Sequence, residues 1–265
     1  MDFSLFFAWQ SDSPLDDNKH LIRDAAKIAV KRVAADAEVE ESPRLDHDTK
    51  GMSGTPEVAN AIFSKIERAG MFLADVTFVG SSRSHDGRDK KLPNMNAAIE
   101  LGYAGRAIGW ERIILVMNTA YGQPDEQVFD IKHRRNPITF WVAADSTAEH
   151  RKEERNKLAR TIEESIRARL SNEHEEAKDV SAVLDQHCLD ILIAHAANDW
   201  FSMTPITNMG QALTSQPTLM AIARMLELRL LRCDVQFDPT SKSAKYAYHW
   251  TYLGRLVARH LRIIT

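Results

Sequence analysis

Short apolar runs alternate with amphipathic segments over the first 142 residues, and this alternation leaves very few folds open to the chain. Runs of strand length lie at 3–9, 71–76, 112–117 and 137–142, with a weaker one near 38–40. Segments whose apolar residues recur at three- and four-residue spacing lie between them, at 21–33, 58–69 and 94–108. Strands and helices that alternate in this order form right-handed β-α-β units. We therefore expect an α/β domain of flavodoxin-like type, with an open parallel sheet of five strands.

The alternation of apolar runs and amphipathic segments ends before residue 147, and a strongly charged stretch follows it. A charged helix is expected over 148–171, and the acidic residues Glu173, Glu175 and Glu176 indicate a linker that ends at 182. Beyond it the pattern predicts three helices, two strands joined by a turn and a closing helix, at 184–197, 207–213, 218–231, 231–237, 245–251 and 252–261. This is the element order of a winged helix-turn-helix. The expected organisation is an α/β domain (1–147), a charged helix and linker (148–182) and a smaller winged-helix domain (183–265).

The composition is that of a soluble globular protein, with 44% hydrophobic and 27% charged residues. No apolar run approaches the roughly 18 to 20 residues that span a bilayer, so we expect no membrane partner. The first apolar run has no basic segment before it and is broken at Gln10, which argues against export. Cys188 and Cys233 lie far apart and suggest neither a metal pair nor a disulfide framework. We expect a cytoplasmic protein.

The net charge of −3 conceals an asymmetry between the two parts of the chain. Residues 201–265 hold eight basic and three acidic residues, a net +5, which leaves −8 for the first 200. A basic C-terminal module is compatible with contacts to nucleic-acid phosphates. The candidate contacts are Gln216, Thr218, Arg224, Lys242 and Lys245. Many modules of this shape serve only in dimerisation or ligand sensing, so a nucleotide signal or a protein partner stays an alternative to nucleic acid.

Polar side chains follow the ends of several expected strands. They are Ser11, Asp12, Asp46, Asp48, Asp75, Thr77 and Asn118. Ligands of open parallel sheets bind at the carboxyl ends of the strands, so these side chains are candidate ligand contacts. Plainer interpretations stand beside this one: Asp75 can anchor its own loop, and Asp46 and Asp48 suit a turn better than a metal ion. We expect no metal site.

The segment 93–104 carries the most specific motif of the chain, Pro-Asn-Met-Asn-Ala-Ala-Ile-Glu-Leu-Gly-Tyr-Ala. A long polar loop is expected before it, over 77–93. Helical spacing places Asn96, Glu100 and Tyr103 about one turn apart on adjoining faces, and Asn94 stands at the start of the helix. Trp9, at the end of the first strand, suits either the core or a platform on which a base stacks.

Together with 6–12 and 74–77, this segment resembles the nucleotide-binding TIR-like proteins of bacterial defence systems. Its Asn-x-Asn and Glu-Leu-Gly-Tyr parts are also similar to nucleoside 2-deoxyribosyltransferases. The resemblance covers residues 1–142, and both families cleave an N-glycosidic bond at a ribose. It implies that Glu100 is the catalytic residue. A carboxylate suits this chemistry because departure of the base leaves oxocarbenium-like charge on the sugar.

The resemblance implies an NAD-cleaving glycohydrolase with NAD as substrate and no cofactor. Such a protein is expected to act in antiphage defence, to be a homo-oligomer when active, and to be switched on through its C-terminal module or by assembly. Two alternatives stay open: a non-enzymatic nucleotide-binding sensor, and a deoxyribosyltransferase-like enzyme of free nucleosides. The chain contains no Gly-x-Gly-x-x-Gly after its first strand, no Walker A loop and no Gly-x-Ser-x-Gly, which argues against dehydrogenases, P-loop enzymes and α/β-hydrolases.

Overall fold

A computed structural model describes the protein over most of its length. The described residues are 3–10, 12–36, 43–46, 58–83, 85, 87, 89–134, 136–203, 215–238 and 243–264. The chain forms two compact units, Met1–Arg169 and Leu170–Thr265. The strand expected near 38–40, the helix expected at 207–213 and the turn at 239–242 lie outside the described residues.

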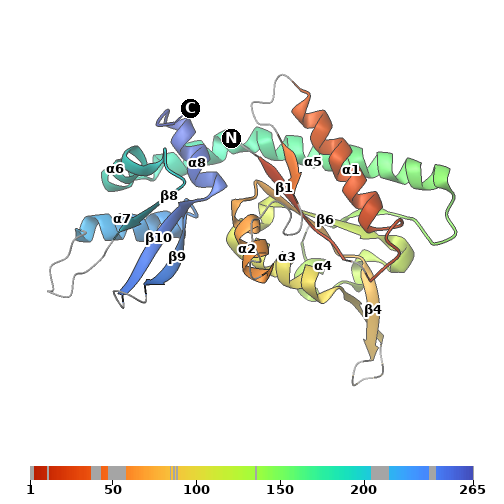
Figure 1. The fold of residues 1–265 in the computed structure, drawn as a ribbon. Helices are drawn as coiled ribbons and strands as arrows, with labels where there is room; N and C mark the ends of the chain where they lie inside the picture. Colours follow the sequence, from red (N-terminus) through yellow and green to blue (C-terminus); the bar gives the residue numbers. More distant parts are fainter. Residues whose placement is uncertain are drawn as a thin grey trace. The chain divides into compact units, whose positions relative to one another are not determined.

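A five-stranded, all-parallel sheet forms the centre of the first unit (Figure 1). Its strands are β1 (Ser4–Ala8), β2 (Arg44–Asp46), β3 (Met71–Asp75), β6 (Ile113–Asn118) and β7 (Ile138–Phe140). They lie in the order β2-β1-β3-β6-β7, which is consistent with a flavodoxin-like fold. All strands point the same way, but the chain adds strands on one side of β1 first and then on the other, so the strand order reverses between β1 and β3. Every residue of β1 and β3 is buried, as expected for strands that helices cover on both faces. The predicted α/β fold with a parallel sheet is confirmed.

Helices lie on both faces of this sheet (Figure 1). α1 (Lys19–Ala34) and the first part of α5 (Ala148–Ala182) share one face, where Arg167 Nη1 lies 2.5 Å from Asp36 Oδ2 just beyond α1. α2 (Val58–Arg68) and α3 (Met95–Ala107) share the other face. Short elements complete the unit: η1 (Trp110–Arg112), η2 (Thr119–Tyr121), η3 (Pro124–Glu126) and α4 (Phe129–Lys132).

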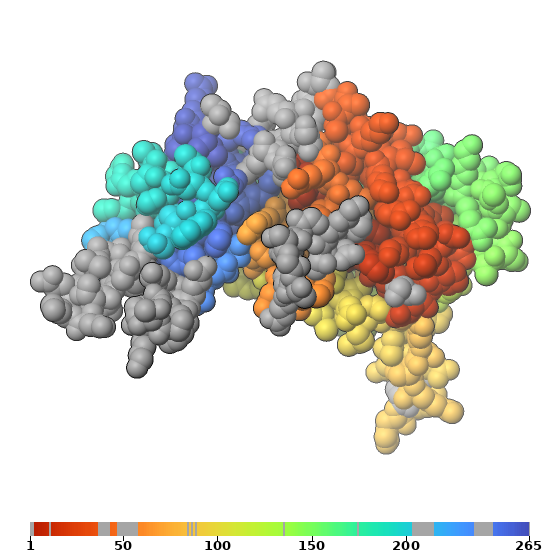
Figure 2. All heavy atoms as spheres, viewed as in Figure 1, coloured from red at the N-terminus to blue at the C-terminus, as the bar shows by residue number. Residues whose placement is uncertain are grey.

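The region expected to be a polar loop, 77–93, is a β-hairpin instead. β4 (Phe78–Arg83) pairs antiparallel with β5 (Asp89–Pro93), and the pair projects from the unit (Figures 1 and 2). The loop prediction was wrong because the usual signal of a strand, apolar residues alternating with polar ones, is missing here. After Phe78 the residues of β4 are partly or fully exposed, so neither face of the hairpin needs an apolar row.

The acidic stretch expected to be a linker is part of a helix. α5 runs without interruption from Ala148 to Ala182, and the boundary between the two units falls inside it. The Glu173 side chain is buried and accepts a hydrogen bond of 2.7 Å from the Tyr252 hydroxyl. Ala177, one turn later, is buried in the apolar core of the second unit. The linker prediction was wrong because Glu173 is buried through its bond with Tyr252, while Glu175 lies on an exposed face of the same helix.

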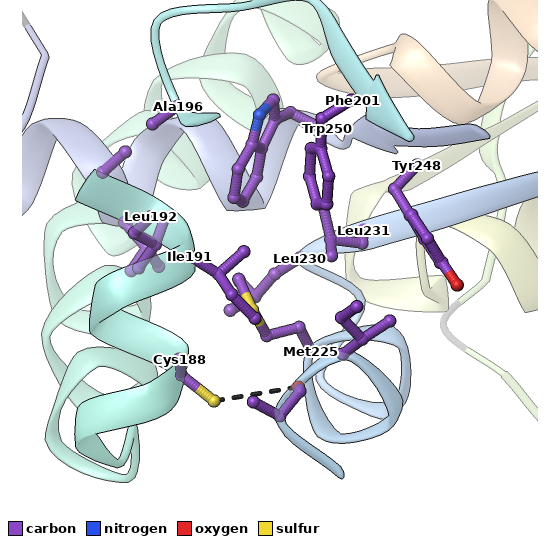
Figure 3. Packing of buried hydrophobic residues seen from close by; sticks show 14 of the residues in the cluster. Cys188, Ile191, Leu192, Ala196, Phe201, Met225, Leu230, Leu231, Tyr248 and Trp250 are labelled. Carbon is purple, nitrogen blue, oxygen red and sulfur yellow. Dashed lines mark hydrogen bonds between the residues drawn. The ribbon is translucent and has the colours of Figure 1, made fainter. Parts of the chain in front are cut away.

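The second unit contains α6 (Gln186–His195), β8 (Trp200–Met203), α7 (Gln216–Glu227), β9 (Leu231–Asp238), β10 (Ser243–Trp250) and α8 (Tyr252–His260). Its antiparallel sheet has the order β8-β10-β9. Side chains of α6, α7 and the sheet, among them Leu192, Met225 and Trp250, form one apolar core (Figure 3). Asp185, Ser215 and Thr251 each accept a hydrogen bond from a backbone N–H in the first turn of a helix, which fixes the starts of α6, α7 and α8. Among the helices in the described ranges, none is long and apolar enough to cross a membrane.

Candidate functional site

A hollow of about 250 Å³ opens beside the carboxyl end of β1. Its walls come from β1 and the residues after it, from α2, and from α3 with its N-cap: Phe6, Phe7, Trp9, Gln10, Val58, Ile62, Asn94, Asn96 and Glu100. β1 borders the position where the strand order reverses, which is where open α/β sheets bind ligands. Four of the candidate residues named from the sequence, Trp9, Asn94, Asn96 and Glu100, therefore meet at one place.

The packing of α3 directs Glu100 into this hollow. Ala97, Leu101 and Ala104, at helical spacing, are buried against the sheet. The helix begins at Asn94, whose Oδ1 accepts a hydrogen bond of 3.0 Å from the backbone N–H of Ala97. This cap fixes the first turn and with it the position of Glu100, which is only partly buried at the side of the apolar stripe.

Burial raises the pKa of the Glu100 carboxyl from its ordinary value of 4.5 to about 7. The cause is the loss of water around the charged form, which the apolar side chains of Phe6, Phe7 and Ile62 do not replace. Among the described residues that line the hollow, Glu100 is the only ionisable one. A carboxyl in such a position exchanges its proton near neutral pH, and it is stabilised as an anion when a cation enters the hollow.

Trp9 forms a second wall of the hollow and is partly buried. The ammonium group of Lys19, in the first turn of α1, lies 3.0 Å from the centroid of the indole ring. This cation–π contact holds the ring in place. Trp9 is therefore at the surface of the hollow and not in the core of the unit.

Asp12 lies at the border of the hollow. The side-chain amide of Asn94 donates a hydrogen bond of 2.6 Å to Asp12 Oδ2, so that one residue both caps α3 and orients this carboxylate. Asp12 itself is exposed. Ser11, its predicted companion, lies outside the described residues.

Asp75, Thr77 and Asn118 lie at the carboxyl edge of the sheet, as predicted, but all three are fully buried. Asp75 accepts hydrogen bonds from Gln10 Nε2 at 3.3 Å and from the backbone N–H of Thr77 at 3.0 Å, and its burial raises its pKa. Thr77 Oγ1 accepts a hydrogen bond of 2.9 Å from the backbone N–H of Asn118. These side chains present no surface to a ligand in this structure. Of the three, Asp75 is connected to the hollow by its hydrogen bond from Gln10, which lines it.

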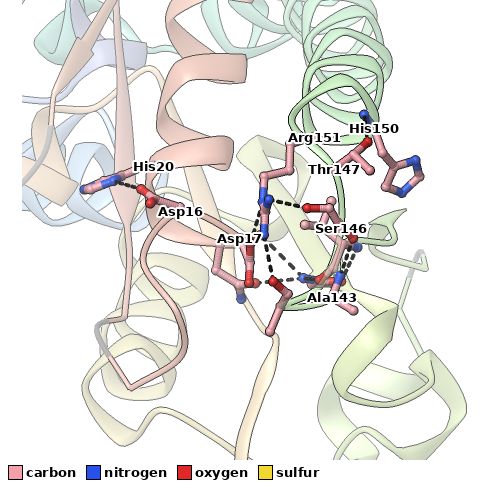
Figure 4. A network of polar contacts seen from close by, with 12 residues as sticks. Asp16, Asp17, His20, Ala143, Ser146, Thr147, His150 and Arg151 are labelled. Atoms are coloured by element: carbon pink, nitrogen blue, oxygen red, sulfur yellow. Dashed lines mark hydrogen bonds and ion pairs between the residues drawn. The ribbon is translucent and has the colours of Figure 1, made fainter.

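A second polar network supports the same edge of the sheet (Figure 4). Arg151, in the first turns of α5, donates from Nε to Asp17 Oδ1 at 2.8 Å and also to the backbone oxygens of Ser146 and Ala144. Asp17 precedes α1, so this pair ties the start of α1 to the start of α5. Nothing in the sequence pointed to the pair, because 134 residues separate its members.

Tyr103 does not line the hollow. Its ring stacks on Phe63 of α2 with 4.2 Å between the ring centroids, and its hydroxyl donates a hydrogen bond to Glu67. Tyr103 therefore fastens α3 to α2 and supports the position of Glu100 indirectly. Asp46, a second candidate from the sequence, forms an ion pair with Lys65 at 2.8 Å, and Asp48 lies outside the described residues. Within the described ranges, no group of three or more potential ligands could hold a metal ion.

Of the nucleic-acid candidates, Gln216, Thr218 and Arg224 lie on α7, and Lys245 lies on β10. Gln216 and Thr218 occupy the first turn of α7, where the Thr218 hydroxyl lies 2.8 Å from that of Ser215. Arg224 faces Asp185, with 3.7 Å between nitrogen and oxygen. Lys242 and the side chain of Lys245 lie outside the part of the protein that the structure describes.

No known protein-family description matches the chain, and no curated protein matches its sequence. The residues around the hollow therefore carry the functional assignment by themselves.

Proposed function

We propose that the first unit is a TIR-type glycohydrolase that cleaves the bond between nicotinamide and ribose in NAD, with Glu100 as its catalytic residue. The observation that carries this proposal is a carboxyl with a pKa near 7, placed in a hollow whose other described walls are aromatic, aliphatic and amide side chains. The hollow holds no second described acid or base, and the reaction needs none for departure of the base, because nicotinamide leaves as a neutral molecule from a cationic substrate.

The steps follow from this chemistry. The C1′–N1 bond breaks and its electron pair moves to the pyridinium ring, which releases neutral nicotinamide. The positive charge that develops on the ribose is stabilised by the ionised Glu100 carboxylate. A water molecule then adds to C1′ and gives up one proton, which Glu100 accepts. A carboxyl with a pKa near the working pH is well matched to this role as a base.

The other walls of the hollow fit the nicotinamide riboside half of the substrate. Lys19 covers one face of the Trp9 indole, and the other face is offered to the pyridinium ring for stacking. The amides of Asn96 and Gln10 supply both donors and acceptors for the carboxamide and for ribose hydroxyls. Gln10 is itself held by Asp75 and by Ser13, whose hydroxyl accepts a hydrogen bond of 2.6 Å from Gln10 Nε2.

The experiment that tests the proposal offers three substrates to the purified full chain: NAD, a purine deoxynucleoside with a second free base, and NADH. The proposal is supported if NAD releases nicotinamide while NADH and the deoxynucleoside do not react, because NADH lacks the cationic leaving group. Base exchange on the deoxynucleoside would instead support the transferase alternative. Binding of NAD without turnover, with and without nucleic acid or cyclic nucleotides, would favour the non-enzymatic sensor.

For the second unit we propose a winged-helix module that regulates the first. The order α6-β8-α7-β9-β10-α8, with β8 and β9 paired to β10, supports this assignment. The excess of basic residues after position 200 suits contacts to phosphates, although Arg224 already faces Asp185.

Fluorescence anisotropy with labelled duplex DNA, compared at low and high salt, tests nucleic-acid binding. Sedimentation with and without NAD tests the proposed assembly. Both cysteines are free, which is compatible with the proposed cytoplasmic location.

A further inference from the structure

Two more hollows adjoin the one that contains Glu100. One of about 300 Å³ shares Asn94 and Asn96 with it and extends along Val79–Ser81 of the hairpin. The other, of about 310 Å³, shares Asp12 and Val79–Ser81 with the second. Successive hollows have wall residues in common, so the three adjoin one another from Glu100 to Lys91 on β5, and we call this row of hollows the cleft.

The two neighbouring hollows, of about 300 and 310 Å³, each add more space than the first hollow holds by itself. The first hollow alone, at about 250 Å³, lies below the roughly 300 to 1,000 Å³ that is usual for sites of drug-sized ligands. We propose that the β4–β5 hairpin forms a second subsite for the far half of a dinucleotide, so that the enzyme acts on NAD and discriminates against single nucleosides. The inference rests on the proposed function, since it concerns the same substrate.

The middle of the cleft has room for the group that links the two halves of a dinucleotide. Gly80 has no side chain, and a Cβ placed there would meet no atom within 4 Å, so the backbone is open to a ligand. The Ser81 hydroxyl stands next to it. Asp12, oriented by Asn94, presents a carboxylate that accepts hydrogen bonds from ribose hydroxyls.

Lys91 supplies a cation at the far end of the cleft. Its Nζ lies 2.8 Å from Glu126 Oε2, which also accepts a hydrogen bond of 2.7 Å from the backbone N–H of Gln123. The ammonium group has three donors, so two are left for phosphate oxygens after the contact with Glu126. Two carboxylates, Asp12 and Glu126, accompany this one cation, which disfavours a ligand with as many negative charges as a triphosphate.

The wall that carries Lys91 is held against the body of the unit. Gly122 has a φ of 149°, and a Cβ there would lie 2.6 Å from the Phe78 ring and 2.8 Å from Lys91 Nζ. Such close packing joins the loop after η2 to the base of the hairpin. The partly exposed ring of Tyr121 lines this end of the cleft beside the buried Phe78, so that an adenine ring has the Tyr121 ring to contact.

The test measures binding in a Glu100→Gln background, where turnover does not interfere, by calorimetric titration with NAD, nicotinamide riboside and ADP. Two variants alter the second subsite: Lys91→Met removes the cation, and Gly80→Leu fills the open space over the backbone. Lys90→Met is the matched control, because Lys90 is exposed, precedes Lys91 in the strand and does not line the cleft. Melting temperatures of all variants show whether they fold.

We expect NAD to bind at least tenfold more tightly than nicotinamide riboside, and ADP to compete with NAD. Lys91→Met and Gly80→Leu should each reduce this preference to less than threefold, while Lys90→Met preserves it. Equal affinity for NAD and nicotinamide riboside, or equal effects of the two lysine variants, would overturn the second subsite and leave the proposed function standing. If neither ligand binds and the wild-type chain releases no nicotinamide, both proposals are wrong.

Discussion

Glu100→Gln should stabilise the protein at neutral and alkaline pH, because it removes a carboxylate that the fold holds in an unfavourable place. Burial raises the pKa of this carboxyl from 4.5 to about 7. The folded chain therefore binds the Glu100 proton more tightly than the unfolded chain does. Stability from the protonated carboxyl is fully present below about pH 4.5 and is lost as the pH rises through about 7. The amide side chain of the variant stays neutral throughout and avoids this loss.

The size of the effect follows from the pKa difference. One pKa unit corresponds to about 1.4 kcal/mol, so a change from 4.5 to about 7 sets an upper limit of about 3 kcal/mol. Glu100 is only partly buried, and solvent screening reduces this limit to about 1 to 2 kcal/mol. For a chain of this size that gain raises the melting temperature by roughly 2 to 8 °C.

Thermal unfolding of the wild type and of Glu100→Gln, recorded in steps from pH 4.5 to 8.5, measures this gain. The matched control is Glu164→Gln, an exposed glutamate on α5 that should change the melting temperature by little at any pH. We expect the difference between Glu100→Gln and the wild type to grow with pH and to level off above about pH 7. A difference that is constant with pH, or equal in the two variants, would refute the claim that burial in the hollow destabilises the charged form of Glu100.

Three further predictions concern the chemistry of the site and its support. The kcat/KM for NAD should rise about tenfold per pH unit below about pH 7 and level off above it, because the ionised carboxylate is the active form, and a flat profile would contradict this role. Arg151→Met leaves the buried Asp17 carboxylate without its cation and should lower the free energy of unfolding by about 2 to 3 kcal/mol. Lys152→Met, which changes an exposed neighbour, should alter it by less than about 0.5 kcal/mol. Equal effects of the two variants in denaturant titrations would argue against a stabilising Arg151–Asp17 pair. Limited proteolysis should spare residues 172–182, because they are helical and packed, and rapid cleavage there would restore the linker interpretation.

The parts of the fold that the sequence predicted are those with a strong local pattern. β1 and β3 stand out as continuous apolar runs because both of their faces are buried. α3 stands out by its Asn94 cap and its stripe of Ala97, Leu101 and Ala104. Since the carboxyl ends of parallel strands share one edge, the position of the site followed from the topology before any side chain was placed.

The parts that the sequence did not predict depend on contacts between distant residues or on the lack of a buried face. The hairpin has no apolar row. The buried residues of α5 belong to two separate cores, so they form no single apolar stripe that the sequence would show. The burial of Asp75 and its bond to Gln10, 65 residues away, cannot be read from either residue alone. A polar residue at the end of a strand predicts the edge on which it lies and not whether it faces the ligand or the interior.

The most direct test of the central claim is the rate of nicotinamide release from NAD at pH 8, compared between the wild type, Glu100→Gln and Glu164→Gln under the same activating condition. At this pH a carboxyl with a pKa of about 7 is mostly ionised, so we expect the wild-type rate to be at its plateau. Loss of one preorganised electrostatic contact costs about 3 to 4 kcal/mol, so Glu100→Gln should be roughly 100- to 1,000-fold slower while it melts at or above the wild-type temperature. Glu164→Gln should match the wild type. Release at the wild-type rate from a folded Glu100→Gln protein would contradict the account.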